Sequence, residues 1–115
     1  KKPSDPRYRA LSEAGARLMT VAPDREGHVD LKKLFRKLAA ENISSVLIEG
    51  GAGIITSALR EGLARRLVVV TAPKIIGKGI EAVGDLNIRD LKDAKPLSVR
   101  KIFKKGPDVI MDARL

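Results

Sequence analysis

The stretch VLIEGGAGIITSAL, from Val46 to Leu59, constrains the fold of this chain more than any other feature of the sequence. An aliphatic run ends in Glu49, and three glycines follow within four positions: Gly50, Gly51 and Gly53. Glycine inside regular structure costs about 0.5–1 kcal/mol relative to alanine, so stability does not explain the cluster. The pattern predicts a buried strand, then a turn with bare backbone, then a helix.

The segments on either side of the glycines extend this pattern. Residues 44–48 (SSVLI) and 66–73 (RLVVVTAP) are apolar without polar alternation, which is typical of strands buried on both faces of a parallel sheet. Between them, apolar residues share one helical face, and Gly62 is a plausible helix end. The region from Val46 to Val70 therefore predicts a strand–helix–strand unit with a right-handed crossover.

Local signals predict two further helices in the first forty residues. After a Pro-rich start, Asp5 or Ser4 is a candidate N-cap, and Gly15 is a candidate helix end. Residues 17–23 read as a short strand and residues 24–29 as an exposed loop. Asp30 is a good N-cap for a second helix, whose apolar stripe recurs at i, i+3, i+4 and i+7: Leu31, Leu34, Phe35 and Leu38.

The end of the chain has a different pattern. Residues 97–105 and 109–115 read as two strands joined by a tight turn at Gly106-Pro107-Asp108. The expected fold is α/β, with three layers: a mainly parallel sheet flanked by helices, with an antiparallel hairpin at the C-terminus.

The glycine turn is a candidate anion site. The first amides of a helix lack partners and carry partial positive charge, and glycine lets a phosphate approach them without meeting a side chain. The run Gly51-x-Gly53-x-x-Thr56 resembles a dinucleotide fingerprint, but has Thr where Gly or Ala is usual. The alternative is a tight turn with close packing and no ligand.

Two neighbouring features extend the candidate site. The Glu49 carboxylate could accept hydrogen bonds from a substrate or assist proton transfer, or it could cap the following helix. In the segment APKIIGKG, Lys74 or Lys78 could contact an anion, although an ordinary basic turn explains the segment equally well.

Composition limits the classes of function. The 115 residues carry a net charge of +9 but only 3% aromatic residues, which argues against recognition of single strands by stacking. The absence of cysteine favours a reducing cytoplasm, and one histidine excludes a metal centre built from several imidazoles. No apolar run reaches the roughly 20 residues of a membrane span. No catalytic arrangement stands out, so no catalytic residue and no metal ligand is assigned.

The stretch from Gly27 to Gly79, with its Glu-Gly-Gly turn and Pro-Lys-x-x-Gly loop, resembles the reductase domain of riboflavin biosynthesis. The resemblance implies a fold similar to dihydrofolate reductase and an NADPH-dependent oxidoreductase. Its substrate would be a pyrimidine 5′-phosphate, either 5-amino-6-(5-phosphoribosylamino)uracil or the diamino-pyrimidinone analogue, whose ribosylamino group is reduced to the ribitylamino form.

The resemblance also implies roles for particular residues. Glu49 matches a glutamate that contacts the substrate. The segment lining the phosphates of NADPH would comprise Gly50, Gly51, Ala52, Gly53, Ile54, Ile55, Thr56 and Ser57, through main-chain amides and the hydroxyls of Thr56 and Ser57. The expected partners are the small-molecule substrate and a second copy of the chain, and neither nucleic acid nor a membrane.

The chain departs from the family pattern in two ways. Reductase domains of this kind are roughly twice as long, so residues 1–115 are expected to be a single domain that forms the C-terminal half of a larger one. Such a half could be inactive alone. The pair Arg65-Arg66 stands where the family usually has acidic residues. The alternative function is a non-catalytic nucleotide- or nucleic-acid-binding module that uses the basic surface.

Overall fold

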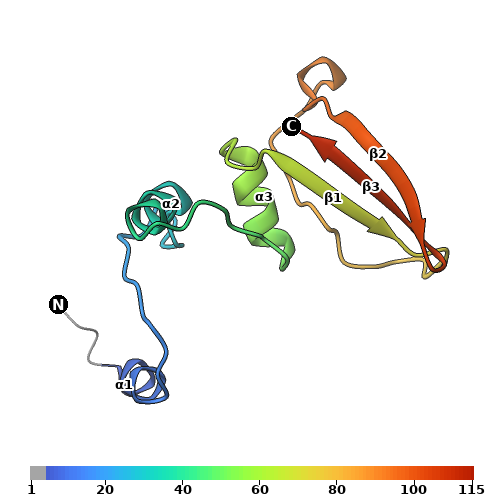
Figure 1. Cartoon of the computed structure of the whole chain (residues 1–115). Coiled ribbons are helices and arrows are strands. Elements are labelled where there is room, and N and C mark those ends of the chain that lie inside the picture. Colours follow the sequence, from blue (N-terminus) through green and yellow to red (C-terminus); the bar gives the residue numbers. More distant parts are fainter. Residues whose placement is uncertain (1–4) are drawn as a thin grey trace. The chain divides into compact units, whose positions relative to one another are not determined.

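The computed structural model describes residues 5–115, which contain three α-helices, a short 3-10 helix and three β-strands (Figure 1). The chain divides into two compact units, Lys1–Ser44 and Ser45–Leu115. The first unit is helical, whereas the second holds the glycine turn and the sheet.

In the first unit, α1 (Pro6–Glu13) begins where the sequence predicts. The Asp5 carboxylate caps it by accepting a hydrogen bond of 2.9 Å from the Arg7 main-chain N–H. The helix ends before Gly15, whose φ of +84° is a conformation that glycine adopts readily. Both predictions are confirmed; the other candidate cap, Ser4, lies outside the described residues.

The second helix, α2 (Leu31–Ala40), confirms the predicted cap and stripe. The Asp30 carboxylate accepts from the Lys33 N–H at 2.9 Å, and Leu31 is buried. Residues 24–29 form the predicted loop, in which the Asp24 carboxylate accepts from two main-chain N–H groups.

The predicted strand over residues 17–23 is wrong. Only Pro23 takes part in a β-bridge, with Val29. The segment instead lies against α2, where Arg17 pairs with Glu41 and Lys37 donates to the Thr20 carbonyl at 2.9 Å. The side chains of Lys37 in α2 and of Glu41 at its C-cap hold this segment, and no strand is available to pair with it among residues 5–44.

The second unit contains α3 (Ala52–Arg60), β1 (Arg66–Thr71), the 3-10 helix η1 (Leu91–Asp93), β2 (Ser98–Lys105) and β3 (Asp108–Arg114). The strand order is β1-β3-β2, and both pairings are antiparallel. The predicted hairpin of β2 and β3 is confirmed, with Gly106 at φ +60° in its turn. Figure 1 shows α3 beside the end of the sheet where β1 begins.

The core of this unit is small. Ala113 on the central strand β3 is fully buried, opposite Leu67 of β1 and Val99 of β2. Ala58 and Leu59 of α3 are buried as well. These side chains fix the sheet and α3, and α3 in turn carries the glycine turn at its N-terminus.

The expectation of a mainly parallel, three-layer sheet is wrong for the described residues, whose only sheet is antiparallel. Residues 43–49 belong to no strand, and the side chains of Val46 and Leu47 are 48% and 79% exposed. A parallel strand needs a neighbour that supplies hydrogen bonds along its whole length. Residues 45–115 provide none for this segment, and β1 pairs instead with the returning strand of the hairpin.

Candidate functional site

Among the α-helices of residues 5–115, α3 is the one whose first turn has no side-chain cap. Its N-cap is Gly51, and no side chain accepts a hydrogen bond from the first amides. By contrast, Asp5 and Asp30 cap α1 and α2. The first turn of α3 also contains no acidic residue. Its partial positive charge is therefore left for an external anion.

The three glycines of the turn leave open space around the backbone. Gly51 has φ +74° and ψ 125°, a conformation that favours glycine. Gly50 and Gly53 do not have positive φ, and a Cβ at any of the three would meet no heavy atom within 4 Å. The fold therefore explains the glycine at Gly51 but not at the other two positions, where bare backbone has no structural cause.

Glu49 lies just before this turn with an exposed side chain. It makes no ion pair or side-chain hydrogen bond with residues 5–115, and it does not cap α3. The capping alternative is thereby removed, and the carboxylate is available to bind hydroxyl or amino groups.

The remaining residues of the predicted cofactor segment differ in position. Ile54 is 42% exposed, whereas Ile55, Ala52 and Ser57 are half-buried. Thr56 is 6% exposed, and its hydroxyl donates to the Ala52 carbonyl at 2.6 Å. Its proton is therefore committed within the protein.

The segment from Pro73 to Gly79 is exposed along its length. Lys74 and Lys78 make no ion pair with the described residues, and the side chains of Ile75 and Ile76 are almost fully exposed. The lysines are thus free to meet an anion, while the two isoleucines contribute nothing to the core.

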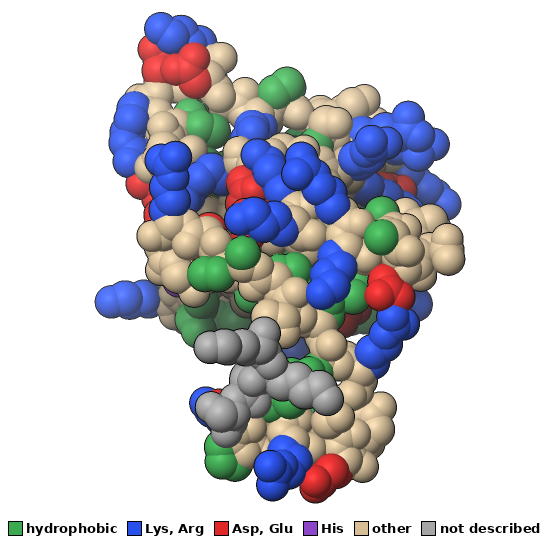
Figure 2. Space-filling view, turned by 90° about the vertical axis from the view of Figure 1, so that its left-hand side faces the viewer, with side chains coloured by type: hydrophobic (Ala, Val, Ile, Leu, Met, Phe, Trp, Pro, Cys, Tyr) green, Lys and Arg blue, Asp and Glu red, His purple; other side chains and the backbone are tan. Residues whose placement is uncertain are grey.

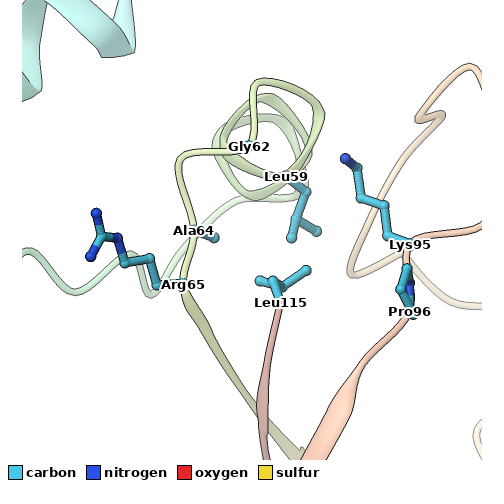
Figure 3. A pocket seen from close by; sticks show the side chains of 7 residues that line it. All are labelled: Leu59, Gly62, Ala64, Arg65, Lys95, Pro96 and Leu115. Carbon is cyan, nitrogen blue, oxygen red and sulfur yellow. The ribbon is translucent and has the colours of Figure 1, made fainter.

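A separate pocket of about 370 Å³ lies at the other end of α3. Figure 3 shows Leu59 and Leu115 facing one another across it, while the Arg65 side chain points away. The full lining is Leu59, Gly62, Ala64, Arg65, Lys95, Pro96 and Leu115. No residue of the predicted cofactor or substrate site contributes to it.

The basic residues do not form one continuous patch on the face in Figure 2, where they alternate with acidic, apolar and other side chains. Some have structural partners that the sequence did not reveal: Arg66 clamps Asp112 across the β1–β3 pair at 2.8 and 3.0 Å. This guanidinium holds the pKa of the Asp112 carboxyl below its usual range.

Residues 5–115 contain no group of three histidine, aspartate or glutamate side chains placed to hold a metal ion. No helix in that range is long and apolar enough to cross a bilayer.

Comparison with known proteins shows which family the chain resembles. Residues 6–111 match the family described as the RibD C-terminal domain. The riboflavin biosynthesis protein RibD of Aquifex aeolicus is 37% identical over 82 residues, which cover 71% of this chain and 23% of that protein. The protein of the same name from Escherichia coli K12 is 32% identical over 92 residues, or 79% of this chain and 25% of that protein.

A solved structure of Acinetobacter baumannii RibD matches with a TM-score of 0.76 and 20% identity, covering 92% of this chain and 28% of that one. This likeness establishes the fold. The resemblance drawn from the Glu-Gly-Gly turn is confirmed, and the chain spans about a quarter of the length of the relatives it matches.

Proposed function

The chain belongs to the RibD C-terminal domain family, and from that membership we propose that its protein is an NADPH-dependent reductase of riboflavin biosynthesis. The substrate we propose is the ribosylamino pyrimidine 5′-phosphate, with or without prior deamination, and the product is its ribitylamino form. We further propose that the enzyme works in the cytoplasm as a homodimer.

The observation that supports this proposal best is the start of α3. It combines an uncapped first turn with glycines whose Cβ positions are empty, and Gly53 has no structural need to be glycine. A dinucleotide diphosphate fits this arrangement, because its oxygens can approach the main-chain amides directly. The amides around Gly51 and Ala52 would hold the diphosphate through hydrogen bonds and the helix dipole.

Glu49 would act on the other ligand. Its unpaired carboxylate precedes the turn, and a carboxylate binds hydroxyl and amino groups as a hydrogen-bond acceptor. We assign it to orienting the ribosylamino group. NADPH, when bound, supplies the hydride, and the chain contributes position and electrostatics.

The test uses two substitutions of Gly53. Aspartate at this first-turn position favours the helix dipole, so Gly53→Asp is expected to fold normally. Its negative charge would repel the diphosphate and weaken NADPH binding by about tenfold or more, an effect of about 1.4 kcal/mol or greater. Gly53→Ala, the neutral control, is expected to weaken binding less.

NADPH affinity is measured by fluorescence titration of the full-length protein. Binding by Gly53→Asp as tight as by the unchanged protein would contradict the phosphate site. A normal thermal melt of the same variant would show that the fold is intact.

A further inference from the structure

Thr56 is a buried polar residue on α3 whose hydroxyl joins two distant segments. Its Oγ1 donates to the Ala52 carbonyl at 2.6 Å and accepts from the Gly84 N–H at 2.7 Å. Gly84 lies 28 positions later in the chain, within the long connection between β1 and β2. One hydroxyl thus links the first turn of α3 to that connection.

A second contact lies one helical turn further along α3. The Arg60 guanidinium donates to the Asp85 carbonyl at 2.6 Å. Since Thr56 and Arg60 are four residues apart, they lie on the same face of the helix. Two successive residues of the connection, Gly84 and Asp85, are therefore hydrogen-bonded to side chains of α3.

The fastened segment is also braced internally. The Asp85 carboxylate accepts from both terminal nitrogens of Arg89 at 2.7 Å and from the Asn87 N–H at 2.7 Å. The Arg89 guanidinium, followed by the Asn87 N–H, holds the pKa of Asp85 well below its usual range. These bonds join Asp85 to Asn87 and Arg89 within the connection, and charged partners strengthen them.

The approach of the two segments is close. Among the glycines of residues 5–115, only Gly84 has another atom within 4 Å of where its Cβ would be: Thr56 Oγ1 lies at 3.4 Å and Thr56 Cγ2 at 3.9 Å. Valine would fill the space of Thr56 equally well, but it would leave the partly buried Gly84 N–H without this acceptor. The hydroxyl, rather than the volume, therefore distinguishes threonine here.

We propose that Thr56 is a positioning residue, which sets the first turn of α3 and the connection after β1 in one arrangement for binding the dinucleotide. This inference rests on the function proposed above. The family resemblance implied that the Thr56 hydroxyl contacts the cofactor directly. The role proposed here is indirect, because the hydroxyl proton is donated to the Ala52 carbonyl. The same connection carries the Pro73–Gly79 segment.

The test compares Thr56→Val with Thr56→Ser in the longest natural form of the protein. Valine removes both hydrogen bonds and is expected to raise the KM for NADPH about tenfold with little change in kcat. Serine keeps the hydroxyl and is expected to restore most of the affinity. Arg60→Met, at an exposed position near the end of α3, removes the second hydrogen bond to the connection and is expected to raise the KM about twofold to threefold without impairing folding.

Amide hydrogen exchange provides a readout that does not need the cofactor. Faster exchange at Gly84 is expected in Thr56→Val but not in Thr56→Ser, because valine leaves the Gly84 N–H without its acceptor. A lower melting temperature with unchanged KM and unchanged exchange would reduce Thr56 to a packing role and overturn the inference. Failure of the unchanged protein to bind NADPH would contradict the proposed function instead, and the exchange comparison would still decide whether Thr56 fastens the connection.

Discussion

Replacing Gly51 and Gly53 separately by alanine is expected to shift the stability of the fold in opposite directions. Gly51 has φ +74° and ψ 125°, a region where an L-residue costs about 1–3 kcal/mol. Gly53 lies inside the first turn of α3 without positive φ, and alanine there gains about 0.5–1 kcal/mol by restricting the unfolded chain. The two variants should therefore differ by about 1.5–4 kcal/mol.

Neighbouring atoms do not obscure this comparison. A Cβ at either position meets no heavy atom within 4 Å, so both substitutions act through backbone conformation alone. Urea unfolding followed by far-ultraviolet circular dichroism measures the difference as a shift in the transition midpoint. Equal shifts of the same sign would refute the reasoning, because they would mean that the two glycines do not differ in backbone conformation.

Three further predictions concern packing, pH and salt. Leu59→Ala, at a buried position of α3, should lower the free energy of unfolding by about 2–3 kcal/mol. Ile54→Ala, at a position that is 42% exposed, should lower it by less than about 1 kcal/mol, and thermal melts compare the two variants. The Lys33 N–H and ammonium lower the pKa of Asp30 below its ordinary value of 3.8, so its contribution to stability is full above that value and is lost as the pH falls. The difference in the free energy of unfolding between the unchanged protein and Asp30→Ala should therefore be largest near neutral pH and shrink as the pH falls below 3.8. A difference that stays constant down to low pH would contradict the assignment. NADPH affinity should fall only slightly between low and moderate salt, whereas a steep fall in the binding of a polyanion would indicate a nucleic-acid-binding surface.

Local signals in the sequence predicted several helix ends and turns correctly. Asp30 and its apolar stripe gave a correct helix because capping and helical spacing act within a few residues. The turn at Gly51 and the hairpin turn at Gly106 were predicted for the same reason, since both need backbone conformations that glycine readily adopts.

Strand pairing could not be predicted in the same way. The run Arg66–Thr71 is apolar enough for either a parallel or an antiparallel neighbour, and the choice depends on β3, more than thirty residues later. Residues 44–48 have strand-like composition, but a strand also needs a partner, which residues 45–115 do not supply. Composition alone cannot reveal whether that partner exists.

Hydrogen bonds and ion pairs between distant segments could not be predicted, because no pattern in the sequence indicates them. The Thr56–Gly84 bond spans 28 positions, and the Arg66–Asp112 pair spans 46. The family resemblance implied a cofactor contact for the Thr56 hydroxyl, whereas its hydrogen bonds are made within the protein. Only the folded chain brings these groups together.

The central claim is that the bare amides at the head of α3 hold the diphosphate of NADPH. Titrating the 15N-labelled protein with NADPH and recording main-chain amide shifts tests it most directly. The claim predicts saturable shifts that are largest at Gly51, Ala52 and Gly53 and weaker in Gly53→Asp. Saturable binding that leaves these three amides unmoved would contradict it.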